Sequence, residues 1–191
     1  MMRDMITRTR CYRRFKQDIP IAEDTLKELV DIARISASAS NRQPLRYMLS
    51  CDPKQNENIF SHLSWAGYLK DWDGPHGGQR PAAYILVLGD RTISTSPQYD
   101  AGIAVQNIRL AAMEKGIGSC VIGSVRRDDL RKTTDIPKEM EILLVLAMGI
   151  PDEDIMIDTV VNKDIRYWRD EHGVHHVPKR KLNDCIQNIH T

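Results

Sequence analysis

Two arginines and two amides near the N-terminus are the side chains of this sequence best suited to bind a ligand. Arg10 and Arg13 stand before the first predicted helix, and Asn41 and Gln43 lie in a polar turn after it. An arginine presents a rigid, charged fork that matches phosphate oxygens, and each amide offers a donor and an acceptor. A flat ligand with a phosphate tail and a polar ring edge, such as flavin mononucleotide (FMN), would use all four. The alternative is a basic N-terminal segment and a polar turn that bind nothing.

Five motifs, in order along nearly the whole chain, resemble those of the nitroreductase family. Residues 10–15 (RCYRRF) are similar to its flavin-phosphate motif, and residues 38–44 (SASNRQP) are similar to its second flavin segment. Residues 100–107 resemble the central helix of the family, residues 116–123 the strand that follows, and residues 178–180 its closing basic pair. One such match would be weak evidence, but five in order and at compatible spacing indicate the family.

The resemblance implies a role in FMN binding for each of these segments. Arg10 would bind the phosphate, and Arg13 would lie at the pyrimidine edge, where a fixed cation tunes the flavin by stabilising the charge that develops on reduction. Cys11 stands where the family commonly has Ser, and a thiol is the poorer hydrogen-bond donor, although its backbone N–H can still serve. The other implied contacts are Ser38, Asn41 and Gln43 to the flavin of a second subunit, Ile122 and Gly123 beside flavin N5, and Lys179 and Arg180 at the phosphate.

Several of these residues also have a purely structural alternative. Arg10 could form a surface ion pair, and Ser38 could cap the end of the first helix. A strand glycine such as Gly123 often marks a β-bulge, and Lys179 and Arg180 could form a solvated basic turn. No side chain is expected to act as a catalytic acid, base or nucleophile, because the redox chemistry belongs to the cofactor.

Hydrophobic periodicity predicts strands that alternate with helices. Apolar residues at helical spacing indicate helices, and near-continuous apolar runs indicate strands buried on both faces of a sheet. Residues 152–165 have little periodicity and are expected to be extended, and residues 170–173 are expected to form the turn of a hairpin. The predicted helices span residues 22–36, 56–63, 101–115, 127–133 and 182–189, and the predicted strands span 47–51, 82–88, 121–125 and 141–148.

This order of elements predicts one α+β domain over residues 1–191, of the three-layer α/β/α kind, with a mixed central sheet flanked by helices. The alanine-rich face of the 101–115 helix permits close packing, either within the chain or against a second subunit. The family resemblance implies an intertwined homodimer with flavins at the interface, in which a C-terminal tail, residues 152–191, embraces the partner.

Composition limits the other partners. A formal net charge of +1 over 191 residues gives no overall field that points to nucleic acid, and no apolar run approaches the roughly 20 residues that span a bilayer. Residues 1–6 lack the apolar region of a signal peptide, and the four cysteines lack a paired spacing, so we expect free thiols in a reducing cytoplasm. The spacing of His172, His175 and His176 fits no common metal site, and we interpret these residues as part of a surface hairpin.

An aromatic loop follows the 56–63 helix. Trp65, Tyr68 and Trp72 lie in a stretch that is bounded by glycine and proline. They could cover a flat substrate stacked on the flavin, or they could anchor the loop in the core. The sequence favours neither role and names no substrate.

The sequence therefore predicts an FMN-dependent oxidoreductase. By the resemblance, NAD(P)H passes a hydride to flavin N5, and an electron-poor acceptor such as a nitroaromatic or a quinone then takes the electrons. Two alternatives stay open. One is another flavin-dependent reaction on the same fold, such as dehalogenation or flavin fragmentation. The other is a protein that stores or senses FMN without turnover.

Overall fold

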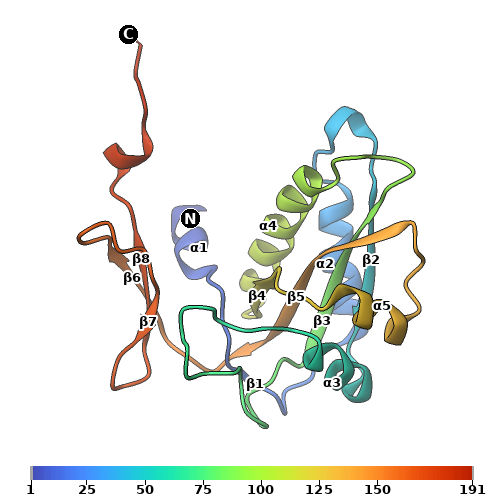
Figure 1. Cartoon of the computed structure of the whole chain (residues 1–191), viewed down its shortest axis with the longest axis horizontal. Helices are drawn as coiled ribbons and strands as arrows, with labels where there is room; N and C mark the ends of the chain where they lie inside the picture. The colour runs from blue at the N-terminus through green and yellow to red at the C-terminus, as the bar shows by residue number, and fades with distance from the viewer. Residues whose placement is uncertain (1, 191) are drawn as a thin grey trace.

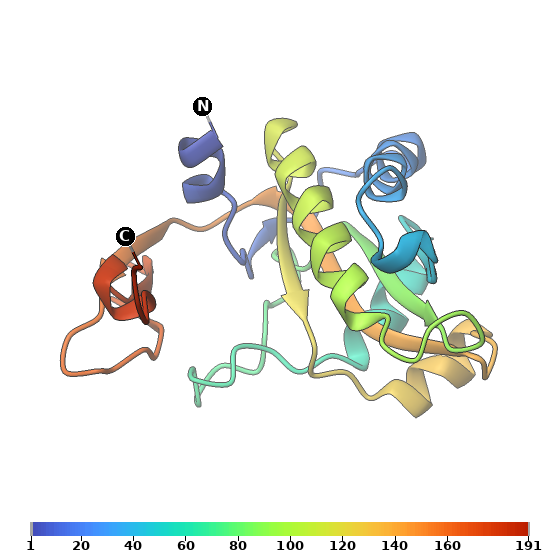
Figure 2. The same ribbon diagram turned by 90° about the horizontal axis from the view of Figure 1, so that it is seen from above.

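The computed structural model describes residues 2–190 and contains a five-stranded sheet between two layers of helices (Figures 1 and 2). Its long strand β5 (Met140–Pro151) pairs antiparallel with β3 (Ala83–Asp90), with β4 (Gly118–Ile122) and with the short β1 (Phe15–Lys16). At the far side of β3 lies β2 (Leu45–Ser50), again antiparallel. A parallel bridge from Cys11 to Ser119 extends the β4 edge. The α+β class and the three-layer arrangement are confirmed.

Strand β3 shows why the layers form on both faces of the sheet. Its side chains alternate in direction, and all eight of its residues are buried. Ile85 and Val87 belong to the apolar cluster under one helix layer, whereas Tyr84 and Leu86 belong to the cluster on the other face. The near-continuous apolar run in the sequence is therefore the mark of a strand covered twice.

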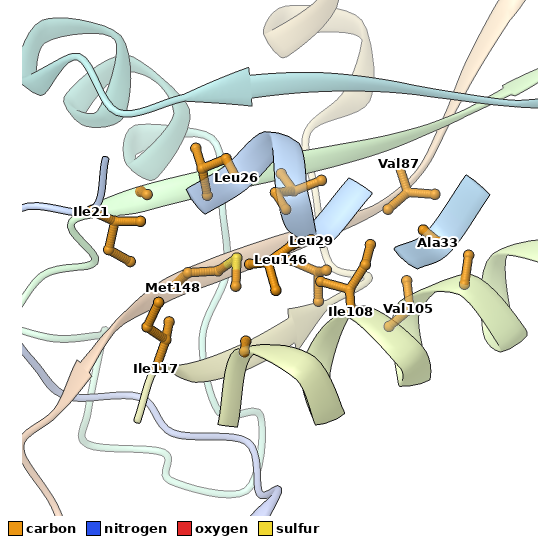
Figure 3. Close-up of a cluster of buried hydrophobic side chains, with 14 of the residues drawn as sticks. Ile21, Leu26, Leu29, Ala33, Val87, Val105, Ile108, Ile117, Leu146 and Met148 are labelled. Carbon is orange, nitrogen blue, oxygen red and sulfur yellow. The ribbon is translucent and has the colours of Figure 1, made fainter. Parts of the chain in front are cut away.

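Helices α2 (Glu23–Arg34) and α4 (Gln98–Glu114) cover the first face of the sheet. In α2, Leu26, Leu29 and Ala33 fall at helical spacing and pack into the cluster shown in Figure 3. The small residues of α4, including Ala104 and Ala112, are buried in the same cluster. The alanine-rich face thus packs within the chain. Helix α4 begins at Gln98, three residues before the predicted start. The prediction missed these residues because they are polar and carry no periodic signal.

The second face of the sheet is covered by α3 (Pro53–Ser61) and α5 (Arg127–Thr134), with Ile59 and Leu130 fully buried. A further helix, α1 (Met2–Arg8), packs beside α4 and has no buried residue. Because α1 has no apolar face buried in the core, periodicity does not predict it. Strand β4 begins three residues before the predicted strand 121–125. The prediction missed its start because glycine and serine have low strand propensity.

The tail after β5 forms a second sheet, which lies to one side of the first in both views (Figures 1 and 2). In it, β8 (His175–Lys179) pairs parallel with β6 (Ile155–Thr159) and antiparallel with β7 (Trp168–Arg169). The expected hairpin is thus present. The predicted helix at 182–189 is wrong: only a 3₁₀ turn, η2 (Leu182–Cys185), forms. Leu182, Ile186 and Ile189 are exposed, so no packing stabilises a helix too short to form alone.

Candidate functional site

Arginines from three parts of the chain meet at the segment between α1 and β1. Arg10, Arg13 and Arg14 lie on this segment, Arg109 reaches it from α4, and Arg169 reaches it from β7. The pKa of Arg10 is lowered by burial and by the nearby charge of Arg109. Like charges held this close, at a partly buried position, favour a bound anion.

The carboxylate of Glu153 ties this segment to the tail. Its side chain is buried and accepts hydrogen bonds from the backbone N–H groups of Arg13 and Arg14, the latter at 3.2 Å. It also pairs with the Arg169 guanidinium, with Nη2 to Oε2 at 2.9 Å. Such charge-assisted bonds are roughly twice as strong as neutral ones. Glu153 therefore positions the segment that carries Arg13, although one carboxylate does not balance the surrounding arginines.

The guanidinium of Arg13 is held from three sides. Its Nη1 donates to the Cys11 carbonyl oxygen at 3.3 Å and to His175 Nε2 at 2.7 Å, and its Cζ lies 4.5 Å from the centre of the Tyr167 ring. Because arginine can only donate, His175 Nε2 is the acceptor, and the imidazole proton must sit on Nδ1. His175 is fully buried. Burial and the Arg13 charge lower the pKa of His175 to about 3.

This arrangement corrects our interpretation of the histidines as parts of a surface hairpin. His175 lies beneath Arg13, and the other face of the strand carries His176, whose Nδ1 lies 2.8 Å from Asp158. His172 alone is exposed on the turn. Within residues 2–190, no group of three or more His, Cys, Asp or Glu side chains could hold a metal ion.

Within residues 2–190, seven buried side-chain N–H donors have no hydrogen-bond partner, and five of them belong to this arginine group or to residues that pack near it. The five are Arg10 Nε, Arg14 Nε, Arg169 Nε, Trp65 Nε1 and His175 Nδ1, and the other two are Gln55 Nε2 and Arg80 Nε. Buried donors are normally paired, so a surplus of them asks for an explanation. A ligand rich in acceptors and negatively charged would satisfy them. FMN, with a phosphate and a carbonyl-bearing ring, meets both conditions, and the donor set therefore fits it.

A cavity of about 220 Å³ opens beside Arg13. It brings together predicted residues that are far apart in the sequence, since Ile122 at the end of β4 and Gly123 just after it line the cavity together with Trp65 of the aromatic loop. A Cβ added at Gly123 would meet only the Leu144 side chain, at 3.9 Å. The fold itself therefore does not require glycine there. The bare backbone leaves room for a ligand to approach.

The segment from Ser38 to Gln43 lies elsewhere, against the start of α4. Buried Asp100 accepts hydrogen bonds from the Ala39 N–H at 2.8 Å and from the Ser38 hydroxyl at 3.2 Å. Ser40, Asn41 and Gln43 all have φ near +50°, a strained region for residues other than glycine that often marks functional sites. Asn41 and Gln43 are exposed. The segment shares no residue with the 220 Å³ cavity and borders a separate one of about 140 Å³.

The remaining predicted phosphate ligands are not brought together. Arg10 is half-buried, and its Nη2 donates to the Ile6 carbonyl oxygen at 2.6 Å. Within residues 2–190 it forms no salt bridge, so the surface ion pair is absent. Lys179 and Arg180 are exposed at the end of β8. No side-chain hydrogen bond or salt bridge links either of them to Arg10 in the described part of the chain. Their role at the phosphate stays a prediction.

The aromatic loop is anchored in the core and also borders the cavity. Trp65 is buried, lies 5.7 Å from Phe60 and packs edge-on against Trp72 at 6.5 Å. Trp72 is half-buried beneath Arg169, whose Cζ lies 4.3 Å from its ring centre. Tyr68 is exposed and stacks obliquely on Tyr167 at 4.9 Å. Anchoring therefore accounts for Trp65 and Trp72, whereas Tyr68 remains free to cover a ligand.

Sequence reasoning missed Arg109, Glu153, Tyr167 and His175. Arg109 could have been found, because it interrupts an otherwise apolar stretch of a predicted buried helix. Glu153 and His175 have no local signal: they lie 140 and 162 residues from Arg13 along the chain. Only the fold brings them to it.

Comparisons with known proteins agree on one family. The model of the family described as "Nitroreductase family" matches residues 6–150. The chain is 26% identical over 169 residues to the iodotyrosine deiodinase of Thermotoga neapolitana, which covers 80% of this chain and 90% of that protein. It is 28% identical over 163 residues to an NADPH-dependent oxidoreductase of Staphylococcus saprophyticus, covering 74% and 61% of the two chains.

Solved structures show the same fold. An FMN-dependent nitroreductase of Clostridium difficile R20291 superposes with a TM-score of 0.65 and 23% sequence identity, over 86% of this chain and 97% of that one. No helix among residues 2–190 is long and apolar enough to cross a membrane.

Proposed function

This chain belongs to the nitroreductase family, and on that premise we propose that it is an FMN-dependent oxidoreductase that takes a hydride from NAD(P)H and reduces an electron-poor small molecule. The observation that carries the proposal is the group of arginines and unpaired N–H donors around Arg13, which itself lines a cavity that also contains the bare backbone of Gly123. When bound, the flavin supplies the redox chemistry, and the protein supplies binding, orientation and electrostatics.

The residues divide that work by position. Arg10 binds the phosphate, with Lys179 and Arg180 closing on it from the tail. Arg13 places its cation at the pyrimidine edge of the ring, and it can do so precisely because His175, Tyr167 and the Cys11 carbonyl restrict its guanidinium. A charge whose orientation is set beforehand costs no reorganisation when negative charge develops beside it.

Gly123 and Ile122 present backbone to the reactive side of the ring, where the missing Cβ admits close approach. Trp65 closes the cavity below, and Tyr68 covers the substrate from the exposed side. Protons for the acceptor come from solvent, since no acid or base side chain is assigned at the cavity.

A homodimer completes the site in this proposal. Exposed apolar side chains on the tail support it: Val161 is 67% exposed, Leu182 73% and Ile189 73%, and such surfaces mark protein–protein contacts. The strained turn at Asn41 and Gln43 also supports it, because these side chains are exposed and neither lines the 220 Å³ cavity beside Arg13 of the same chain. Their place is then the flavin of the second subunit.

Reduction of the bound flavin tests the proposal. The purified protein is expected to be yellow, to hold about one FMN per chain, and to bleach under anaerobic conditions when NADH or NADPH is added. Colour should return when a nitroaromatic or a quinone is mixed with the reduced protein. A colourless protein that fails to bind added FMN would contradict the proposal. A flavoprotein that neither nicotinamide reduces would be a store or sensor.

Dehalogenation is the second candidate, favoured by the 26% identity to a deiodinase. It uses the same cofactor site and differs only in the acceptor. Adding an iodinated phenol to the pre-reduced protein decides between them. Iodide release without reoxidation by nitroaromatics would assign the dehalogenase activity.

A further inference from the structure

Two cysteines meet at the edge of the main sheet. Cys11 pairs with Ser119 of β4 through a parallel backbone bridge, and the next residue is Cys120. Cys11 packs against the apolar cluster that contains Cys120, and both thiols are free. The Arg109 Nη2 also lies 3.7 Å from Cys11 Sγ. Neither cysteine has a role in the hydride transfer proposed above.

The surroundings make the two thiols unequal. The neighbouring Cys120 thiol and the Arg109 charge together outweigh burial and hold the pKa of Cys11 well below its usual range. The nearness of Cys11 and burial raise the pKa of Cys120. A thiolate is the reactive form of cysteine. Cys11, which is half-buried, is therefore the nucleophile, and Cys120 is a protonated thiol within reach of it.

We propose that Cys11 and Cys120 form a redox-active dithiol that a hydroperoxide oxidises to a disulfide. The Cys11 thiolate attacks one peroxide oxygen and breaks the O–O bond, and the other oxygen leaves as water or an alcohol after taking a proton. Cys11 is now a sulfenic acid. The Cys120 sulfur then attacks the Cys11 sulfur, and its proton leaves with the displaced hydroxide as water. In total the two thiols lose two electrons, and the hydroperoxide gains them.

The two cysteines lie beside the residues proposed to bind flavin, but the thiol oxidation proposed here does not require flavin. Cys11 stands between Arg10 and Arg13, and Cys120 lines the cavity with Gly123. Oxidation replaces a thiolate by a neutral disulfide, which removes a negative charge from beside Arg109. The pair can be tested with FMN bound and with FMN removed. Failure of the flavin proposal and failure of this one are therefore separate results.

The test uses a variant in which the two exposed cysteines are replaced, Cys51→Ser with Cys185→Ser. The reduced protein, with FMN and after its removal, is treated with hydrogen peroxide and analysed by mass spectrometry. We expect the mass to fall by two hydrogens, the peptides of Cys11 and Cys120 to be joined, and dithiothreitol to reverse both changes. Adding Cys120→Ala should stop the reaction at a Cys11 sulfenic acid, which dimedone traps.

A second measurement separates activation of Cys11 from mere proximity. The alkylation rate of Cys11 by iodoacetamide should have its midpoint below pH ~8.5, the value of a free thiol, and Arg109→Gln should move that midpoint upward. The matched control keeps Cys51 and carries Cys11→Ser, Cys120→Ala and Cys185→Ser. At neutral pH Cys11 should react roughly tenfold faster than Cys51. No linked peptide in either flavin state, or equal reactivity of Cys11 and Cys51, would overturn the proposal.

Discussion

At the scale of single residues, the surroundings of Arg10 suit the phosphate-binding role that we propose for it. Its charge is disfavoured by burial and by Arg109, and its Nε is buried without a partner. A phosphate removes both penalties. We expect Arg10→Ala to weaken FMN binding roughly tenfold or more, because a hydrogen bond to a charged group is worth about 1.5–3 kcal/mol. Titration by flavin fluorescence measures this. Riboflavin, which lacks the phosphate, should lose little affinity, and Arg3→Ala on exposed α1 is the matched control. Equal effects of both variants would place the phosphate elsewhere.

The role that we propose for Arg13 is at the flavin ring rather than at the phosphate. Arg13→Gln keeps a donor and removes the charge, so the reduced flavin loses stabilisation relative to the oxidised one. A loss of about 1–3 kcal/mol lowers the midpoint potential by tens of millivolts, since about 30 mV corresponds to 1.4 kcal/mol for two electrons. A redox titration of both proteins measures the shift. An unchanged midpoint with FMN still bound would show that Arg13 does not face the ring.

These residues differ in how visible they are in the sequence. Arg10, Arg13 and Gly123 belong to short motifs whose residue types indicate a possible chemical role. The sequence alone is therefore enough to identify them as candidate site residues. His175 looks like any histidine of a hairpin. Its role exists only because β8 passes beneath Arg13, and long-range contact of this kind leaves no local pattern.

At the scale of elements, the turn at 38–43 depends on one buried carboxylate. Asp100→Ala would leave the Ser38 and Ala39 donors without their acceptor. Three left-handed residues in the turn add strain that these bonds offset. We expect the free energy of unfolding to fall by about 1–3 kcal/mol, as measured by urea denaturation. Asp18→Ala removes an exposed carboxylate from another turn and should change little. A neutral Asp100→Ala would mean that the turn is held by other contacts.

The contact of the tail with Arg13 should make stability depend on pH. In the folded protein the pKa of His175 is about 3, whereas the usual value is 6.5. Between these values only the unfolded chain binds the proton, so this group destabilises the fold as pH falls below about 6.5. His175→Gln keeps an acceptor for Arg13 and cannot titrate. It should remove about 1–2 kcal/mol of the stability lost between about pH 7 and pH 5.

His176 titrates in the opposite sense but is present in both proteins. Burial opposes its charge, yet hydrogen bonds to Asp158 and Asp170 raise its pKa, so it stabilises the fold below its unfolded pKa. Its contribution cancels when His175→Gln is compared with the parent in denaturant titrations at each pH. The exposed His172→Gln is the control. Parallel pH profiles of the parent and His175→Gln would rule out a buried, neutral His175.

Elements were predictable where burial follows periodicity. The apolar residues of β3, β5 and α2 are buried in the core, and their spacing in the sequence predicts these elements. The start of β4 was not predictable, because pairing with β5 decides where this strand begins. The lack of a helix after β8 was not predictable either, because it follows from the absence of a packing surface for that segment. Tertiary contacts, rather than local preference, place these boundaries.

At the scale of the whole molecule, the tail has two parts that make different contacts. The first part, which contains Glu153 and His175, holds the segment of Arg13. The last part carries the exposed side chains of Leu182 and Ile189. Ending the chain after Arg180 should weaken dimerisation and leave FMN bound. Ending it after Pro151 should abolish both. Analytical ultracentrifugation and the flavin content of each truncated protein measure the two effects. A flavin-loaded monomer without residues 152–191 would refute this division.

The distance in sequence between Arg13 and its supports has a consequence for synthesis. Glu153 follows Arg13 by 140 residues and His175 follows by 162. At about 5–20 residues per second, a ribosome makes the arginine segment roughly 7–30 s before Glu153. During that interval the segment has neither its carboxylate nor its imidazole. The cavity can therefore assemble only after most of the chain has emerged, and a nascent chain stalled before Glu153 would lack the support that Arg13 has in the folded protein.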